Sequence, residues 1–369
     1  MLAPHLQATS NEMLALDFMR FYASAAIVIH HSHQFFWSES DRPRVIAQSE
    51  GLALFVDLFF VISGFVIAYV YTGRIGNLRQ FARFMQRRVG RLFPLHLLTF
   101  LLSVAMWAGI TRLYTPNHVP SWDQGCMALT AGLLHALIPC GNGDYFNGVN
   151  WSIAAEMVMY ALFPFLAIAA RRSPRLALVG TVLVIAGMIY RVSIPSTEVG
   201  SWTLLYAPLR ALPGFCLGIV MHANRDVLAM TKHPRFAMWT ALVGATSSGI
   251  MGAPTYVALP LFYAAGVAAI AVDLRKDASP FIKRMAPLGQ LTYSIYLWHG
   301  FFITVLLNAV ADKLMHGNFA ALALCTIACF GGIMVWSYLS WRYFETPARQ
   351  WVDSLFGGRK RSVSASLTE

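Results

Sequence analysis

Charged residues are scarce in this chain, and acidic residues are scarcer than basic ones. Only 12% of the 369 residues are charged, and 17 Asp and Glu stand against 28 Lys and Arg, a formal net charge of +11. Soluble domains usually carry about 25% charged residues, so this composition excludes a soluble enzyme. The basic balance does not indicate nucleic-acid binding, because membrane proteins gather Lys and Arg in their cytoplasmic loops.

Cysteine is also rare, with five residues whose spacing matches no metal-binding motif. Three of them lie in apolar runs, where a thiol acts as a small hydrophobic group. Cys126 and Cys140 lie in a segment expected outside the membrane, so a bond between them remains an alternative to two free thiols. The sequence predicts neither a disulfide framework nor a metal site.

Long apolar runs are what the sequence has in abundance. A helix needs roughly 20 apolar residues to cross a bilayer. The first such run is interpreted as a retained span, because no basic region of a signal peptide precedes it. We therefore predict an all-α fold, a polytopic membrane helix bundle of about ten transmembrane helices. The predicted spans are 14–36, 50–72, 92–113, 151–170, 176–194, 203–222, 236–252, 254–272, 286–309 and 320–341.

The basic residues predict how the bundle is oriented. With the N-terminus in the cytoplasm, 21 of the 28 Lys and Arg fall on the cytoplasmic side and five on the outer side. This asymmetry follows the positive-inside rule. It requires the short apolar segment 124–139 to be a re-entrant or surface helix, since a span there would move the later basic loops outside. Both termini are then cytoplasmic, with an N-terminal segment at 1–13, a membrane domain at 14–350 and a disordered tail at 351–369.

Ionisable residues inside predicted spans are functional candidates, because charge at membrane depth is costly. Arg20 and His31 are eleven residues apart on one predicted helix, which places them on one face and about 16.5 Å apart along its axis. Asp17, one turn from Arg20, is equally well explained as an ion pair that fixes packing. His31 could also be a packing histidine or belong to a metal-binding patch with His30 and His33.

Three further ionisable residues are predicted near the depth of His31. Counting about 1.5 Å per residue from the outer ends of their spans places Glu156, Asp57 and Arg210 at similar levels. A carboxylate can hold a buried imidazole in one tautomer as a general base, while an arginine offsets the negative charge. Such a constellation suits the removal of a proton from a hydroxyl group.

A basic amphipathic stretch at 81–94 precedes the third predicted span. Arg88 and Arg91 lie on one face of it and could bind phosphate groups. The alternative is that both side chains contact lipid headgroups and only determine topology.

Six short motifs follow one another along the chain. They are Leu16-Asp17-Phe-Met-Arg20 with His31, Val56-Asp57-Leu-Phe-Phe-Val-Ile-Ser63-Gly64-Phe65, Arg88-x-x-Arg91-x-x-Pro94, Asn150-Trp151-Ser152-Ile-Ala-Ala-Glu156 running to Tyr160, Tyr293-Ser294-Ile-Tyr296-Leu-Trp-His299, and Tyr343-Phe344-Glu345-x-Pro347. In this order they resemble acyltransferase family 3, integral membrane enzymes that O-acylate glycans and some small molecules. The resemblance covers about residues 14–350.

The resemblance implies a ten-span bundle, an acyl-CoA donor from the cytoplasm and an acceptor on the outer side. It implies that His31 is the catalytic histidine and Arg20 its paired basic residue. Arg88 and Arg91 resemble the pair that binds the donor, and Glu156 matches the acid of the Trp-Ser motif. Candidate supporting residues are Arg210, Trp151, Ser152, Tyr293 and His299.

Two positions depart from the family pattern. Ala154 replaces a serine of the Trp-Ser-Leu-Ser segment, and Gly214 stands near a position that often carries glutamate. Neither change removes a proposed reacting group, although both affect local hydrogen bonding. Trp107, Trp122 and Tyr145 near the outer side could stack on sugar rings or anchor the chain at the membrane interface.

The predicted function is transfer of a short acyl group, most consistent with acetyl, from acetyl-CoA or another short acyl-CoA to a hydroxyl of a cell-surface or exported glycan. Arg88 and Arg91 hold the CoA phosphates, while His31 takes the hydroxyl proton and Glu156 or Asp57 orients its ring. A covalent acyl-histidine remains an alternative route, and a small molecule or signalling oligosaccharide an alternative acceptor. From other classes, a proton-coupled membrane transporter and an inert scaffold are alternatives.

The expected partners are acyl-CoA, a glycan or lipid-linked glycan, and membrane lipids. We expect no metal and no nucleic acid. The expected location is the bacterial inner membrane, which the chain crosses several times.

Overall fold

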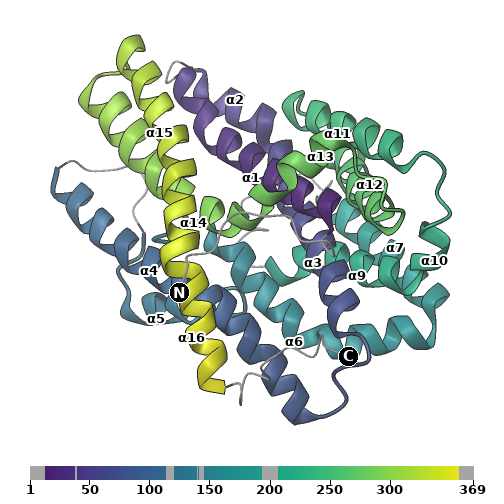
Figure 1. Ribbon diagram of the computed structural model, residues 1–369. Coiled ribbons are helices and arrows are strands. Elements are labelled where there is room, and N and C mark those ends of the chain that lie inside the picture. Colours follow the sequence, from purple (N-terminus) through teal and green to yellow (C-terminus); the bar gives the residue numbers. More distant parts are fainter. Residues whose placement is uncertain are drawn as a thin grey trace, which may run out of the picture.

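The computed structural model describes residues 13–37, 40–113, 120–138, 140, 145–192 and 207–356. All regular elements in these ranges are helices (Figure 1). Most of the predicted N-terminal segment and the end of the predicted tail, residues 1–12 and 357–369, lie outside the described residues. The all-helical fold class is confirmed, while the predicted domain boundaries remain predictions.

Helices occupy the positions of the ten predicted spans. They are α1 (Leu14–Ser32), α3 (Phe55–Tyr71), α4 (Leu78–Leu113), α6 (Asn150–Arg172), α7 (Pro174–Val192), α9 (Ala207–Ala223), α11 (Pro234–Ile250), α12 (Thr255–Leu274), α14 (Thr292–Phe302) with the π-helix η4 (Ile303–Leu314), and α15 (Phe319–Ser340). Shorter elements connect them: η1 (His33–Phe36), α2 (Arg42–Ser49), η2 (Glu50–Leu54), α5 (Gln124–Ala131), α10 (Arg225–Leu228), α13 (Pro280–Met285), η3 (Ala286–Leu291), η5 (Trp341–Glu345) and α16 (Thr346–Phe356).

Six helical stretches of the described chain are long and apolar enough to cross a membrane. They are Glu50–Tyr71, Leu78–Leu113, Asn150–Arg172, Thr255–Leu274, Pro280–Leu314 and Phe319–Leu355. The chain is thus an integral membrane protein. The predicted count of about ten crossings and the cytoplasmic position of both termini remain predictions.

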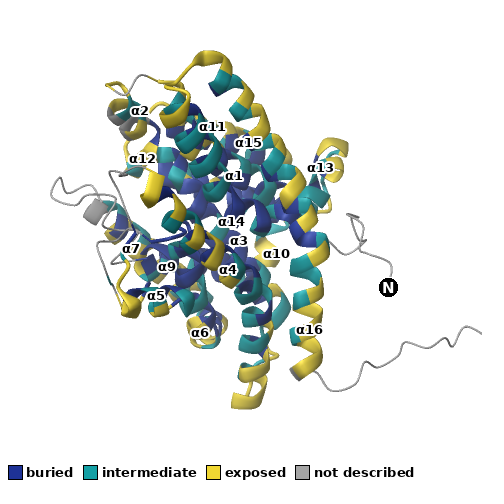
Figure 2. Cartoon of the chain, turned by 90° about the vertical axis from the view of Figure 1, so that its left-hand side faces the viewer, coloured by how far each residue is buried: buried dark blue, intermediate teal, exposed yellow. Residues whose placement is uncertain are grey.

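The surface of the bundle is apolar where several of these helices face outward. Phe165 on α6 and Ile327 on α15 are 71% and 72% exposed. In Figure 2 the buried residues gather around α1, α3 and α14, while exposed residues line the outer helices. Large apolar side chains on outward faces fit contact with hydrocarbon rather than water.

Helices α3 and α9 touch through their backbones. A Cβ atom on Gly64 would lie 2.1 Å from the carbonyl oxygen of Phe215, and one on Gly218 would lie 2.2 Å from that of Val61. Small residues commonly permit such close helix contacts in membranes. The contact fixes α3, which carries Asp57, against α9, which carries Arg210.

Helix α1 is held at its N-terminal end by a carboxylate from another helix. Asp273 of α12 accepts hydrogen bonds from the backbone N–H groups of Ala15 and Leu16, at 2.8 and 2.9 Å. These first-turn groups have no partner within their own helix, and a negative charge there also complements the helix dipole. Because α1 also packs against α3, α12, α14 and η3, it forms the centre of the bundle.

The segment 124–139 forms only a short helix, as expected for a segment that does not span. Helix α5 has eight residues and is about 12 Å long, which is too short to cross the hydrocarbon. Cys126 at its start forms a disulfide with Cys140. The bonded alternative therefore holds for these two cysteines, whereas Cys216, Cys325 and Cys329 are free.

Helix α16 continues the helical part of the chain to Phe356, beyond the predicted tail boundary at 351. It packs along α4, where a Cβ atom on Gly90 would lie 2.7 Å from Val352 (Figure 1). The first six residues of the predicted tail are therefore helical.

Candidate functional site

Two cavities lie along α1, and each receives one of its two predicted site residues. We call the first, of about 120 Å³, the arginine cavity, because Arg20, Arg88 and Arg91 line it. We call the second, of about 600 Å³, the histidine cavity, because His31 and His299 line it. Arg20 and His31 thus lie on one helix, as predicted, but each lines a different cavity.

Helix α4 directs two of its arginines into the arginine cavity. Arg88 and Arg91 line this cavity and are partly buried. Arg83 and Arg87, on the same basic stretch, are exposed. The position of Arg88 and Arg91 favours phosphate binding over headgroup contact, which suits Arg83 and Arg87 better.

Aromatic rings surround the guanidinium of Arg88. Its centre lies 5.4 Å from the ring of Tyr71, 5.9 Å from that of Phe84 and 5.8 Å from that of Tyr160. Its Nη2 donates a hydrogen bond to the Tyr71 hydroxyl at 3.2 Å. Cation–π contacts hold a planar cation in place while leaving N–H donors for an anionic ligand.

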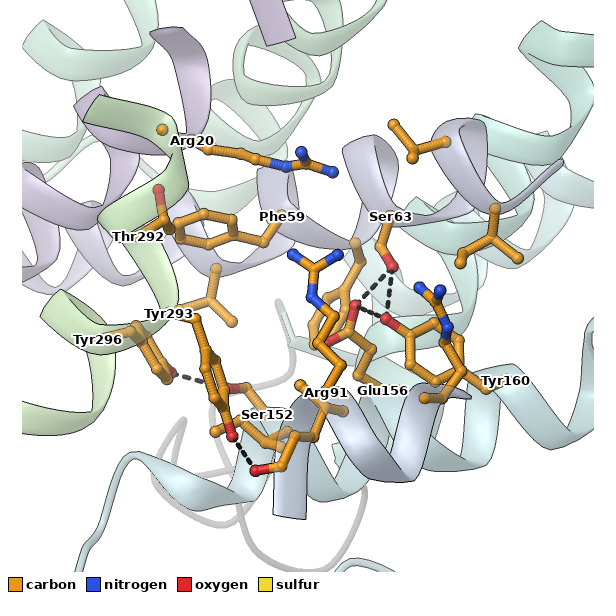
Figure 3. A pocket seen from close by; sticks show the side chains of 18 of the residues that line it. Arg20, Phe59, Ser63, Arg91, Ser152, Glu156, Tyr160, Thr292, Tyr293 and Tyr296 are labelled. Atoms are coloured by element: carbon orange, nitrogen blue, oxygen red, sulfur yellow. Dashed lines mark hydrogen bonds between the residues drawn. The ribbon is translucent and has the colours of Figure 1, made fainter. Parts of the chain in front are cut away.

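The carboxylate of Glu156 lies in the arginine cavity and not beside His31. Its Oε1 accepts hydrogen bonds from Ser63 Oγ and from the Tyr160 hydroxyl, both at 2.5 Å (Figure 3). Arg20 and Arg91 point into the same space (Figure 3). Glu156 is therefore placed to balance cationic side chains, and the structure does not bring it together with His31 as predicted.

Asp57 and Arg210, which were predicted at a common depth, form a buried ion pair. Arg210 Nη2 lies 2.8 Å from Asp57 Oδ2, and the two side chains are 5% and 0% exposed. Arg210 also donates to the carbonyl of Ala53 at 3.2 Å and lies 4.9 Å above the ring of Trp151. The carboxylate of Asp57 thus holds Arg210 at the wall of the histidine cavity, where Trp151 also lies, rather than orienting His31.

His31 and His299 both line the histidine cavity, but only the His31 side chain is exposed. It stacks on the fully buried ring of His299, with ring centroids 5.3 Å apart. A general base must come within hydrogen-bond reach of the proton that it removes. His31 can meet this requirement for a molecule bound in the cavity. The stacked ring of His299 supports the His31 ring.

Both ring nitrogens of His33, a member of the alternative metal patch, have other partners. The Nε2 atom of His33 lies 2.7 Å from Ser49 Oγ, and its Nδ1 atom lies 2.7 Å from the carbonyl of His30. Within the described ranges, no three or more His, Cys, Asp and Glu side chains are arranged to hold a metal ion. Asp17 forms an ion pair with Arg20 at 3.0 Å, which was one of its two interpretations.

Aromatic and amide side chains line the rest of the histidine cavity. Trp107, Tyr145 and Trp151 lie in its wall, together with the amides Gln34 and Asn147. Trp122 does not line it and instead packs on Phe146, with ring centroids 4.9 Å apart. Aromatic rings and polar side chains thus face the same cavity, as they do in sites that bind small polar ligands.

The remaining motif residues converge on the arginine cavity. Tyr293 lines it and donates a hydrogen bond to the carbonyl of Leu92 at 2.5 Å. The hydroxyls of Ser152 and Tyr296, which also line it, are 2.7 Å apart. Ser294 donates to Glu345 at 2.9 Å and so links the last two motifs.

The site also contains residues that the sequence did not single out. Ser63 and Tyr160 bind Glu156, while Val56 and Tyr296 line both cavities. All four stand inside the quoted motifs, within a turn or two of a predicted residue. Their place in the motifs was the signal available for finding them.

Known proteins resemble the chain over most of its length. Residues 13–342 match a family model described as an acyltransferase domain. The chain is 26% identical over 371 residues to the O-acetyltransferase OatA of Staphylococcus aureus, an alignment that covers 91% of this chain and 57% of OatA. It is 32% identical over 192 residues to Protein 2 in the picA locus of Rhizobium radiobacter, covering 49% of this chain and 92% of that protein.

The chain is also 26% identical over 155 residues to the acyltransferase MdmB of Streptomyces mycarofaciens. This alignment covers 41% of this chain and 38% of MdmB. The chain spans little more than half the length of OatA. No solved structure matches it significantly.

Proposed function

The chain belongs to the acyltransferase family whose model matches residues 13–342, and from that premise we propose that it moves an acetyl group from acetyl-CoA to a hydroxyl of a cell-surface or exported glycan. Because the chain belongs to this family, and its relatives are named O-acetyltransferase and acyltransferase, it is an O-acyltransferase. The transporter and the scaffold are therefore no longer alternatives. The donor, the acetyl group and the glycan are the proposal. The observation that carries it is that Arg20 and His31 lie on one helix and line different cavities.

The arginine cavity is proposed to receive the CoA part of the donor. Three arginines line it against the single carboxylate of Glu156, which leaves a net positive lining. Guanidinium groups bind phosphate oxygens through paired, charge-assisted hydrogen bonds. The aromatic surroundings of Arg88 keep one of these groups in place before the donor arrives.

The histidine cavity is proposed to hold the acceptor and the proton-transfer step. His31 removes the proton of the acceptor hydroxyl, whose oxygen attacks the carbonyl carbon of the thioester. The new C–O bond forms as the C–S bond breaks, and the proton passes from His31 to the departing CoA sulfur. The aromatic wall around Trp107 and Tyr145 suits the apolar faces of a sugar, and the amides of Gln34 and Asn147 suit its hydroxyls.

We place the protein in a bacterial inner membrane, with the histidine cavity toward the outer side. The Cys126–Cys140 disulfide supports this orientation, because disulfides persist mainly in oxidising compartments outside the cytoplasm. Pro120 and Tyr145, on either side of that disulfide in the sequence, line the histidine cavity. The basic residues of α4 then fall on the cytoplasmic side, where acyl-CoA is available.

The direct test of the proposal is acetyl transfer by the purified protein. Full-length protein in detergent is incubated with acetyl-CoA and a panel of glycans isolated from the cell surface, and free CoA thiol and acetylated glycan are measured together. We expect both products to rise in parallel. Absence of CoA release with every acceptor, together with unchanged surface glycans in cells lacking the protein, would rule the proposal out.

Removing either cavity-facing arginine should weaken donor binding. We expect Arg88→Ala and Arg91→Ala to raise KM for acetyl-CoA by about 10-fold to 100-fold, because a hydrogen bond to a charged group contributes about 1.5–3 kcal/mol. Steady-state kinetics with varied acetyl-CoA measures the change. Arg83→Ala and Arg87→Ala on the same helix are the matched controls and should leave KM within twofold. Equal effects from all four variants would mean that the arginines act only through the membrane surface.

A further inference from the structure

The two cavities share lining residues on α3 and α14. Of the described residues, only Val56 and Tyr296 line both the arginine cavity and the histidine cavity. They are 5% and 8% exposed, so both side chains are buried where the two cavities adjoin. We call this pair the seam.

The tyrosine side of the seam is fixed by hydrogen bonds. The Tyr296 hydroxyl lies 2.7 Å from Ser152 Oγ and donates to the carbonyl of Val149 at 3.3 Å. The ring of Phe59 packs against it at a steep angle, with centroids 6.2 Å apart. A buried ring held by two polar contacts and one aromatic neighbour has little freedom to move aside.

The valine side of the seam is equally constrained. Val56 precedes Asp57, whose ion pair with Arg210 ties this turn of α3 to α9. Two turns further on, Gly64 lets the backbone of α3 rest directly on α9. The backbone that carries Val56 therefore cannot retreat to enlarge the boundary.

We propose that the seam of Val56 and Tyr296 sets the length of acyl chain that the enzyme transfers, admitting two carbons and opposing longer chains. This inference rests on the proposed function, because it takes acyl-CoA as the donor. The charged part of that donor lies with the arginines, whereas the thioester carbon must reach an acceptor oxygen near His31. The acyl group must therefore lie at the boundary between the cavities when the C–S bond breaks and the C–O bond forms.

The expected size of the effect follows from the cost of one methylene group. A pocket that fits one methylene too few, or one too many, discriminates by about 10-fold to 200-fold. Val56→Ala removes two methyl carbons from the seam without placing a polar group there. Room for a propionyl or butyryl group should appear where only acetyl fitted before.

The experiment compares acyl-CoA donors within each purified full-length variant. The wild type, Val56→Ala and Val66→Ala are given acetyl-CoA, propionyl-CoA and butyryl-CoA with the same acceptor, and kcat/KM is measured from thiol release. Val66 is the matched control, because it is a valine of α3 that lines the arginine cavity but not the histidine cavity. We expect the propionyl-to-acetyl ratio to rise about 10-fold in Val56→Ala and to stay unchanged in Val66→Ala.

The propionyl-to-acetyl ratio is measured within one protein sample. If a variant is only partly folded, both rates fall by the same factor and the ratio does not change. An unchanged ratio in Val56→Ala would overturn the role of the seam, and an equal rise in Val66→Ala would assign chain length to the arginine cavity as a whole. If the wild type consumes acetyl-CoA and the variants give either of these results, the role of the seam is refuted and the proposed function is not. A wild type that consumes no acyl-CoA refutes the proposed function and the seam with it. Tyr296→Phe, which keeps the ring but loses its contacts with Ser152 and Val149, should raise the ratio by a smaller factor.

Discussion

Replacing His31 by alanine is expected to lower kcat for acyl transfer by about 10²-fold to 10⁴-fold, the usual contribution of a general base. The bundle should stay folded, because the His31 side chain faces a cavity and is exposed. Acetyl transfer by the purified variant at saturating donor measures the loss, and its melting temperature in detergent reports the fold.

His33→Ala is the control for this variant. His33 belongs to the same end of the α1 segment but bonds to Ser49 and does not line the histidine cavity. We expect it to keep most of the activity. Transfer at the wild-type rate by His31→Ala, or an equal loss in His33→Ala, would contradict the assigned role. Rapid quenching of the wild type with radiolabelled acetyl-CoA and no acceptor separates the two routes, since a labelled protein would indicate a covalent acyl-histidine.

Asp57→Ala should cost about 3–5 kcal/mol in the free energy of unfolding, because it leaves the charge of Arg210 buried without its partner. The pair lies at the contact between α3 and α9, and both side chains are almost completely buried. Denaturant titration in detergent micelles, followed by tryptophan fluorescence, measures the change.

The double variant Asp57→Ala/Arg210→Met separates this electrostatic effect from lost packing. The double variant has no unpaired buried cation, because Arg210 is replaced as well. It should therefore be more stable than Asp57→Ala alone. If Asp57→Ala were as stable as the wild type, the ion pair would have no structural role. If the double variant were the less stable of the two, the loss would come from packing.

The length of apolar runs predicted the main helices because the bilayer constrains length directly. The predicted span 151–170 corresponds to Asn150–Arg172, and 236–252 to Pro234–Ile250. Elements too short to cross the hydrocarbon carry no such constraint. Helix α2 (Arg42–Ser49) and helix α16 (Thr346–Phe356) mix polar and apolar residues, so length and hydropathy did not indicate them.

The site was predictable where residues share one helix and less so between helices. The eleven-residue spacing of Arg20 and His31 depends only on helix geometry, which is fixed. Depth alone grouped Glu156 with His31, but depth does not determine which way a helix is rotated. Helix α6 turns Glu156 toward Ser63 and Tyr160 in the other cavity.

Contacts between loops could not be predicted from the sequence for a different reason. The sequence separation of Cys126 and Cys140 permits a bond but does not require one, because closing a loop depends on where its two ends are held. Helix α5 and the turns after it bring the ends together. The two cavities and the seam are likewise products of side chains from several helices, so no single segment reveals them.

The continuity of α1 from Leu14 to Ser32, with Arg20 lining one cavity and His31 the other, has a consequence for how material would cross the bilayer. A carrier must expose its binding site alternately to the two sides, and its helices must rearrange in every cycle. Under the proposed function, the nucleotide of the donor can stay on the side where it entered while only its two-carbon fragment changes sides, passing from sulfur to oxygen. The free energy of the thioester would drive this vectorial step, and no cycle of inward-facing and outward-facing states is needed.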